Sequence, residues 1–401
     1  MDANKGRWAF VIIGLIINLC LGAIYSWSVF RKSLEVQFSV GATESLLPFI
    51  IFLAVFAFTM PLVGSPLDRY GPRKMTLIGG LLVAVGWILG SQATSMEMLA
   101  ITYGVIGGIG VGIVYNCPIG VVGRWFPDRR GLAVGITVLG FGLSPLITAP
   151  IANSLIQSNG ALYALGLMGV AFLVIILPLG LPLRFPSEGW SPGGSSGSQG
   201  VSKVGMTRKE MFHTRSFWGL WMCYIIGTLA GLMAIGISSS VGQEVFEIDA
   251  STAAILVGVF AIFNGIGRPI FGSLVDRFTP RITAVLSFIL ILLASVLLAV
   301  GSGPGALAIY VVGFAILWLC LGGWLAIAPT STATFFGTKH YGPNYGALFT
   351  AYGIGAIAGS LLAGNLRDLM GSYTAVFLPV AVLSIVGMAL AFILMRKPSV
   401  S

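Results

Sequence analysis

Long apolar runs recur along the whole chain and are separated by short polar stretches. Each run has about 18 residues or more, which is the length an α-helix needs to cross the hydrocarbon core of a bilayer. None shows the apolar–polar alternation of a β-barrel strand, and a helix satisfies its own backbone hydrogen bonds in lipid. We therefore predict an all-α integral membrane protein with twelve transmembrane helices. The predicted spans are residues 8–30, 45–66, 75–93, 98–123, 131–157, 161–183, 216–241, 251–274, 282–301, 305–334, 344–365 and 373–395.

The few charged residues lie in the polar stretches and are distributed unevenly. The chain is 56% hydrophobic and 9% charged, with a formal net charge of +9. If both termini are cytoplasmic, the inner loops hold 18 of the 22 Lys and Arg residues, and the outer loops hold Arg31, Lys32 and Arg367. This bias follows the positive-inside rule, so we predict cytoplasmic termini and no nucleic-acid partner. The first run is too long for a cleaved signal peptide, and we expect it to remain as a span.

The two halves of the chain resemble each other. Residues 60–74 match residues 268–281 at a constant offset of 208 positions. The shared residues are Pro61, Gly64, Ser65, Asp68, Arg69, Pro72 and Arg73, paired with Pro269, Gly272, Ser273, Asp276, Arg277, Pro280 and Arg281. Such a parallel repeat predicts two bundles that rock about a site near the membrane midplane.

The repeat and a polar stretch between the halves define the expected domains. We predict an N-terminal six-helix bundle over 1–183 and a C-terminal six-helix bundle over 216–401. Between them, 184–215 is predicted to be a cytoplasmic linker that ends in a short amphipathic helix. Its Gly/Ser-rich part, 189–205, cannot build a core.

The repeated loops carry charges suited to gating. Asp68 and Asp276 end the second and eighth predicted helices, and basic residues follow each of them. These carboxylates can pair with arginines across the inner interface of the bundles and with helix N-termini. Our hypothesis is that the clusters latch the inner side shut and release it in the inward-facing state; the alternative is a charge cluster that only fixes topology. The predicted gating residues are Asp68, Arg69, Arg73, Asp276, Arg277, Arg281, Arg129 and Arg130.

Arg268 is the one basic residue that falls inside a predicted span, and no predicted span contains a carboxylate to pair with it. The repeat places Met60 at the equivalent position, so the scaffold does not need an arginine there. Arginine at the centre of a helix costs about 2.5–3.5 kcal/mol to insert. We predict that Arg268 faces a central cavity and binds a carboxylate through its planar fork. Snorkelling towards the inner interface, about 12 Å away, is the alternative.

The charge count and the neighbouring polar residues narrow the ligand. One cation neutralises one monoanion, whereas a dianion would require a second cation, so a small monocarboxylate is favoured. A tyrosine hydroxyl can donate to a carboxylate while its ring packs on an alkyl tail, although membrane tyrosines also serve as interface anchors. The predicted substrate-binding residues are Arg268, Tyr115, Tyr352, Tyr25, Asn264 and Asn116.

Other kinds of function lack the residues they require. An enzyme needs a nucleophile with a base, paired carboxylates or a metal cluster. The chain has two histidines, both in predicted loops, and its four cysteines form no CxxC pair, so we expect apolar cysteine side chains. We therefore predict no catalytic residue, no metal and no cofactor. A sensor that binds ligand without transporting it is a further alternative.

Several motifs resemble those of known transporters. GSPLDRYGPRK (64–74) resembles the signature loop between helices 2 and 3 of the major facilitator superfamily, and its repeat lies where that superfamily has one. RWFPDRRGLAVGITVLGFG (124–142) resembles the helix 4–5 signature shared by monocarboxylate transporters and oxalate–formate antiporters. The resemblance covers nearly the whole chain, including GIVYN, NGIGRP and GPNYG. It implies the major facilitator fold, Arg268 as the carboxylate ligand, and a monomeric bacterial lactate-type monocarboxylate transporter in the inner (plasma) membrane.

Two positions depart from these families. Proton-coupled monocarboxylate carriers usually have an aspartate one turn before the arginine, where this chain has Asn264, which does not titrate. The oxalate carrier has a lysine soon after the NYG motif, where this chain has Tyr352. The resemblance implies co-transport of a monocarboxylate with a proton by alternating access, with the proton-holding residue left open. A formate or oxalate exchanger is the main alternative, and a drug–proton antiporter is disfavoured because its helix 5 Gly-Pro pattern is missing.

Overall fold

Twelve helices are long and apolar enough to cross a membrane among the residues described by the computed structural model, which are 6–187 and 205–398. Each of them overlaps one predicted span, so the prediction of an all-α protein with twelve spans is confirmed. The Gly/Ser-rich stretch predicted over 189–205 lies outside the described residues except for its last position.

The first half of the chain runs from α2 to α10. Its elements are α2 (Trp8–Leu21), η1 (Gly22–Ser26), α3 (Trp27–Phe38), α4 (Ala42–Thr59), η2 (Met60–Leu62), α5 (Gly64–Tyr70), α6 (Pro72–Gly90), α7 (Met96–Leu99), η3 (Ala100–Gly107), α8 (Gly108–Trp125), α9 (Arg130–Asn159) and α10 (Ala161–Gly180). The first span is composite, because the 3₁₀ segment η1 joins α2 to α3. Gly22 packs directly against the backbone carbonyl of Phe141 on α9, which leaves no room for a side chain at this change of winding.

The second half runs from α11 to α17. Its elements are α11 (Arg208–Phe212), α12 (Arg215–Val245), α13 (Ala250–Arg277), α14 (Pro280–Gly301), α15 (Leu307–Phe336), α16 (Tyr341–Met370), η5 (Tyr373–Val376) and α17 (Phe377–Leu394). A short helix is thus present where one was predicted before the seventh span. Thr207 and Glu210 form a capping box at the start of α11.

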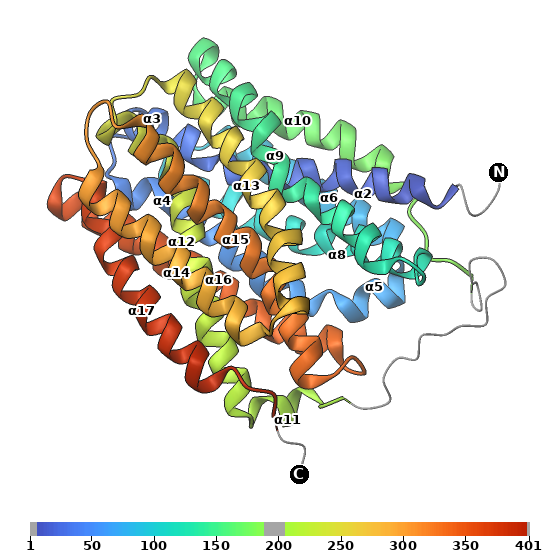
Figure 1. Ribbon diagram of the computed structural model, residues 1–401. Coiled ribbons are helices and arrows are strands. Elements are labelled where there is room, and N and C mark those ends of the chain that lie inside the picture. Colours follow the sequence, from blue (N-terminus) through green and yellow to red (C-terminus); the bar gives the residue numbers. More distant parts are fainter. Residues whose placement is uncertain (1–5, 188–204, 399–401) are drawn as a thin grey trace.

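Two helix pairs hold the halves together, α4 with α16 and α9 with α13 (Figure 1). Glycines let these helices approach closely. A Cβ added to Gly353 on α16 would lie 2.8 Å from the Cβ of Ala57 on α4. A Cβ added to Gly258 on α13 would lie 3.2 Å from the Cα of Leu146 on α9.

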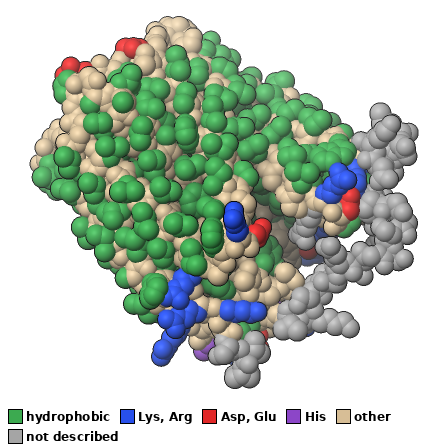
Figure 2. Space-filling model, viewed as in Figure 1, with side chains coloured by type: hydrophobic (Ala, Val, Ile, Leu, Met, Phe, Trp, Pro, Cys, Tyr) green, Lys and Arg blue, Asp and Glu red, His purple; other side chains and the backbone are tan. Residues whose placement is uncertain are grey.

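The two ends of the molecule differ. The start of α2 lies at the right of the view and α11 at the bottom, and we call the side that holds both the termini end (Figure 1). The opposite end, the far end, carries the loops around 39–41, 246–249 and 371–372. Hydrophobic side chains cover most of the face shown in Figure 2, and Lys and Arg gather towards the termini end. This arrangement suits a protein surrounded by lipid, with its basic side predicted to be cytoplasmic.

Towards the termini end, one face of α9 passes from contact with α13 to exposure. Gly135 and Gly142 are seven residues apart and therefore share a face of the helix. At Gly142 that face touches α13, whereas a Cβ added to Gly135 would meet nothing within 4 Å. The face of α9 that packs on α13 at Gly142 is therefore exposed at Gly135.

Candidate functional site

A central cavity lies where the two halves meet and is enclosed by side chains of both. Its volume in this conformation is about 10 Å³, room for about one water molecule. Its lining residues are Tyr25, Phe56, Tyr115, Phe141, Arg268, Leu325, Phe349 and Tyr352. Four of the six predicted substrate-binding residues thus come together, although they are spread over 327 positions of the chain.

Tyr25 and Tyr352 connect the halves across this cavity. Tyr25 lies in η1, in the middle of the first span, and Tyr352 lies in α16. Both side chains are buried, and their hydroxyl oxygens are 2.5 Å apart. The ring of Tyr25 also packs edge-on against Phe141, with centroids 5.1 Å apart. The change of winding at η1 therefore places a polar atom of the first half against a polar atom of the second.

Arg268 brings a charge into the cavity from α13, immediately before Pro269. Its Nη1 donates to the backbone carbonyl of Val138 on α9 at 2.7 Å, and its Nη2 lies 3.5 Å from Oδ1 of Asn264. The buried Nε has no hydrogen-bond partner among the described residues. The side chain therefore lies in the passage between the halves, and one of its donors is left for another acceptor.

The two asparagines have different surroundings. Asn264 is fully buried beside Arg268, and its Nδ2 donates to the carbonyl of Trp318 at 3.3 Å. Asn116 follows Tyr115 in α8 but is not among the cavity-lining residues. Its Nδ2 donates to the carbonyl of Gly112 at 3.1 Å and faces Met60 at 3.4 Å. Successive residues of a helix point in different directions, so the position of Tyr115 in the cavity turns Asn116 away.

The apolar residues of the cavity lining were not predicted from the sequence. Phe56 and Phe141 of the first half, and Leu325 and Phe349 of the second, complete the wall. Phe349 stacks on Tyr352 with centroids 4.9 Å apart, as expected for residues three apart on a helix. Spacing from Tyr352 could have suggested Phe349, but apolar residues in membrane helices are too common for the others to stand out.

The cavity has one formal charge and no acid. Arg268 is the only charged residue of the lining. Within the described residues no group of three His, Cys, Asp or Glu side chains is placed to hold a metal ion, and the four cysteines are free and buried. The chemistry available is a guanidinium with tyrosine hydroxyls amid aromatic and aliphatic surfaces, which suits a small anion with an apolar part.

The predicted gating residues at the termini end make contacts within one half. Asp68 pairs with Arg124 of α8, which also lies over the ring of Phe185 at 3.8 Å. In the second half, Arg281 lies over the ring of Phe392 at 3.8 Å. Among the described residues no ion pair joins the halves at this end. The inner latch stays a prediction, since it concerns a conformation in which these loops approach each other.

A bidentate ion pair ties the start of the first span to the loop before α9. Arg7 donates to both carboxylate oxygens of Asp128, at 2.7 and 2.9 Å. The hydrogen bonds from Arg7 hold the pKa of Asp128 below its usual value. This pair belongs to the first half alone.

Ion pairs do join the halves at the far end, and Arg31 corrects a prediction made from the sequence. It was expected in an outer loop but lies in α3 and is fully buried. It donates to Glu35 at 2.9 Å within the first half and reaches Ser240 of α12 at 3.3 Å in the second. The expectation failed because the first span continues through α3 to Phe38. Arg31 therefore lies within a helix and is buried against α12 of the second half.

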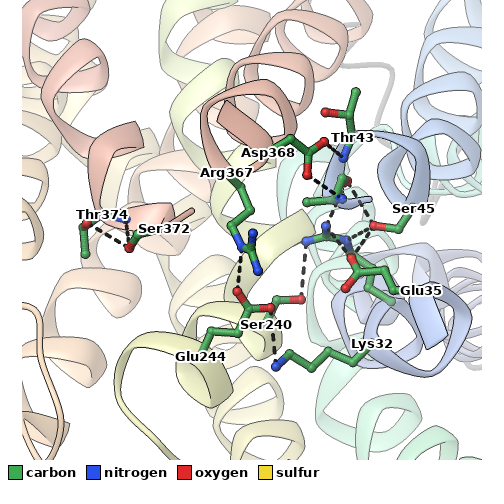
Figure 3. A network of polar contacts seen from close by, with 12 residues as sticks. Lys32, Glu35, Thr43, Ser45, Ser240, Glu244, Arg367, Asp368, Ser372 and Thr374 are labelled. Atoms are coloured by element: carbon green, nitrogen blue, oxygen red, sulfur yellow. Dashed lines mark hydrogen bonds and ion pairs between the residues drawn. The ribbon is translucent and has the colours of Figure 1, made fainter. Parts of the chain in front are cut away.

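The rest of this far-end network comes from acids that also lie in helices (Figure 3). Glu244 at the end of α12 pairs with Lys32 of the first half at 3.4 Å and with Arg367 of α16 at 2.8 Å. The carboxylate of Asp368 accepts hydrogen bonds from the backbone N–H groups of Ala42 and Thr43, each 2.9 Å long. Asp368 therefore caps the N-terminus of α4 from the opposite half.

The family model described as Major Facilitator Superfamily matches residues 8–336 and 243–401. The chain is similar to an oxalate:formate antiporter of Oxalobacter formigenes, with 28% identity over 397 residues, which covers 96% of this chain and 90% of that protein. It is also similar to monocarboxylate transporter 13 of Bos taurus, with 29% identity over 389 residues, which covers 94% of this chain and 87% of that protein.

The fold is also similar to that of a solved structure. The crystal structure of a bacterial homolog to the human lysosomal transporter Spinster superposes with a TM-score of 0.75. The match covers 98% of this chain and 99% of that chain at 16% sequence identity.

Proposed function

The chain belongs to the Major Facilitator Superfamily, and we propose that it is a secondary active transporter of small monocarboxylates such as L-lactate or pyruvate. In this proposal it works as a monomer, by proton symport, in a bacterial inner membrane with both termini in the cytoplasm. The observation that carries the proposal is the cavity between the halves, where Arg268 and three tyrosines face apolar side chains. The similarity to both monocarboxylate transporters and an oxalate:formate antiporter supports a carboxylate as cargo.

Charge neutrality favours a monoanion in this cavity. A carboxylate on Arg268 leaves the site neutral, and closing a paired charge off from water costs less than closing off an unpaired one. A second carboxylate would leave one negative charge without a cation among the lining residues. The rings of Phe56, Phe141 and Phe349 suit the short alkyl group of a lactate-sized acid.

The energetics of moving an anion into a cell support proton coupling, and transport without a proton is the alternative. Importing one negative charge against a negative interior costs about 2.3 kcal/mol per 100 mV, and a co-transported proton removes that cost. The cavity lining contains no carboxylate, so the proton travels on the substrate or through the cluster of Arg268, tyrosine hydroxyls and water. Asn264, beside the arginine, does not titrate.

Alternating access in this proposal is a rocking of the two bundles, 1–183 and 216–401, about the cavity. The far end is closed by the network around Arg31 and Asp368. Release of the clusters around Asp68 and Asp276 would accompany an inward-open arrangement, and their approach would accompany an outward-open one.

Exchange of formate or oxalate is the alternative, and the similarity to the oxalate:formate antiporter favours it. The two functions differ in what drives flux. An exchanger needs substrate on both sides of the membrane, whereas a symporter carries substrate into an empty vesicle when a pH gradient is present.

Uptake by purified protein in proteoliposomes tests the proposal. Labelled L-lactate, pyruvate, acetate, formate and oxalate would be offered with a pH gradient alone, with a membrane potential alone, and with unlabelled substrate inside. We expect lactate or pyruvate uptake that follows the pH gradient. Uptake that persists with potential alone would discard symport, and uptake that requires internal substrate would establish exchange.

The same assay tests the site through Arg268→Lys. Lysine keeps the charge but loses the fork, so we expect uptake to fall at least about tenfold, as for the loss of a hydrogen bond to a charged group. Arg208→Lys, at an exposed position of α11, is the matched control and should transport normally. Normal uptake by Arg268→Lys would remove the arginine from the site.

A further inference from the structure

The bond between Arg268 and Val138 crosses from one half to the other. The donor is a charged side chain of α13, and the acceptor is the backbone carbonyl of α9, 2.7 Å away. A carbonyl oxygen has two lone pairs, so this one can accept from the arginine and also from the helix. The guanidinium that is proposed to bind substrate therefore has an acceptor supplied by the protein itself.

Gly142 makes this approach possible. It lies one turn after Val138 on α9. A Cβ added there would lie 2.7 Å from Oδ1 of Asn264 and 3.1 Å from Nη2 of Arg268, closer than side chains pack. Asn264 has little freedom to withdraw, because it is fully buried, donates to Trp318, and has Gly322 packed on its backbone carbonyl. A side chain at position 142 would displace Oδ1 of Asn264 and shift the guanidinium by a few tenths of an ångström.

We propose that the Val138 carbonyl takes the place of the substrate carboxylate on Arg268 while the transporter returns without cargo, and that Gly142 is the positioning residue that admits the arginine to it. The inference rests on the proposed function, and it adds which kind of flux the site permits. A buried guanidinium with no acceptor is costly, and that cost is what prevents an unloaded carrier from closing. An internal acceptor lowers it, so the unloaded protein can change sides and net transport becomes available alongside exchange.

The substrate competes for the same donor during the loaded half of the cycle. A carboxylate is a charged acceptor and forms a stronger hydrogen bond with a guanidinium than a neutral carbonyl does. Cargo can therefore displace Val138 when it binds, and the carbonyl can take the donor back when cargo leaves. Loss of the carbonyl contact should slow the return of the unloaded protein and spare the loaded steps.

The test compares net efflux with exchange for full-length wild type, Gly142→Ala and Gly135→Ala. Gly135 lies on the same face of α9 but in open space, so alanine there is a matched control. Proteoliposomes are loaded with labelled L-lactate, or with labelled formate in a second series. Efflux is measured into substrate-free buffer and into buffer that contains the same unlabelled acid. We expect wild type and Gly135→Ala to have the same ratio of exchange to net efflux, and Gly142→Ala to raise this ratio about tenfold, as for one lost charged hydrogen bond.

Three outcomes would count against these ideas in different ways. An unchanged ratio in Gly142→Ala, with both fluxes at the wild-type level, would overturn the inference alone. Equal loss of both fluxes would also overturn it, because it would show that α9 only orients the arginine for binding. Absence of both fluxes in wild type, with both acids, would refute the proposed function and the inference with it.

A second variant covers the case in which Gly142→Ala folds poorly. Asn264→Ser removes the atom that a Cβ at position 142 would strike, so Gly142→Ala/Asn264→Ser should have nearly the flux ratio of Asn264→Ser alone. A double variant with a ratio still about tenfold higher than its Asn264→Ser parent would contradict the steric part of the inference.

Discussion

The hydroxyl oxygens of Tyr25 and Tyr352 lie 2.5 Å apart and join the two halves of the protein at the central cavity. One tyrosine comes from η1 and the other from α16, and both line the space that Arg268 enters. Only one proton lies between the two oxygens. The hydroxyl that accepts this bond keeps its own proton, which is available for a substrate oxygen.

The shared bond predicts that the two hydroxyls act as a unit. Tyr25→Phe and Tyr352→Phe should each raise the KM for L-lactate about three- to tenfold, the range for one lost hydrogen bond. The double variant should be little worse than either single one, because each change already breaks the pair. Initial rates of uptake into proteoliposomes measure this, with the exposed Tyr163→Phe as control. Effects that multiply in the double variant would show that the hydroxyls act separately.

A second cation in the cavity should change the preferred charge of the cargo. Tyr352→Lys adds a positive group beside Arg268 in a cavity without an acid. Two cations neutralise a dianion and leave a monoanion complex with excess charge in a low dielectric. We therefore expect the ratio of oxalate to lactate uptake to rise at least about tenfold. Tyr352→Met, which is neutral and of similar length, controls for the loss of the ring; an equal rise there would show that size and not charge sets the preference.

The architecture was accessible from the sequence because lipid imposes strong rules. Span length, the cost of unpaired backbone groups and the repeat around Asp68 and Asp276 lead to twelve helices. Arg268 was predictable for the same reason. A lone charge in an apolar run costs free energy to insert into the membrane, so its presence indicates a functional site. The tyrosines followed because few other side chains in those helices can donate a hydrogen bond.

Features that depend on helix rotation and on helix ends could not be predicted. Tyr115 and Asn116 are neighbours in the sequence, and only the orientation of α8 decides which of them enters the cavity. Arg31 looked like a loop residue because nothing in the sequence marks where the first span stops. The acceptor at Val138 is a backbone atom, and a backbone carbonyl has no signature in the sequence.

The ion pair between Arg7 and Asp128 predicts a pH-dependent contribution to stability. Because pairing lowers the pKa of Asp128 in the folded protein, its stabilising effect is complete above the unfolded value of about 3.9. The effect is lost as the pH falls through the lower folded value. Asp128→Asn should therefore lower the Tm in detergent at pH 7, and the difference from wild type should shrink below about pH 4.

The contribution of the Arg7–Asp128 pair to stability is limited by the solvent exposure of Asp128. The Asp128 side chain is 33% exposed, and a pair of this kind contributes about 1 kcal/mol at most. Asp276→Asn is the control, because Asp276 is exposed and has no ion pair among the described residues. A difference for Asp128→Asn that stays constant from pH 7 to pH 3 would mean that packing, and not charge, is responsible.

The far-end network predicts how the outer closure can be loosened. Arg31, Lys32 and Glu35 give the first half a net charge of +1 at this contact, and Glu244, Arg367 and Asp368 give the second half −1. The two halves therefore attract each other here. Asp368 adds two charge-assisted hydrogen bonds to the start of α4, where the helix N-terminus favours an anion. Removing its charge should shift the population towards molecules that are open at the far end.

Reaction of a reporter cysteine with a water-soluble maleimide measures this shift. Ser240→Cys, in a background with the four native cysteines replaced by alanine, places a thiol that is buried when the far end is closed. Asp368→Asn should raise its labelling rate about tenfold, as expected for a loss of about 1.4 kcal/mol in the closed state. Glu44→Gln removes an exposed acid from the first turn of α4 without breaking a contact between the halves, and should leave the rate unchanged. Equal rates in Asp368→Asn and Glu44→Gln would show that the cap from Asp368 does not hold the far end closed, because loss of the cap would then have no more effect than loss of any nearby charge.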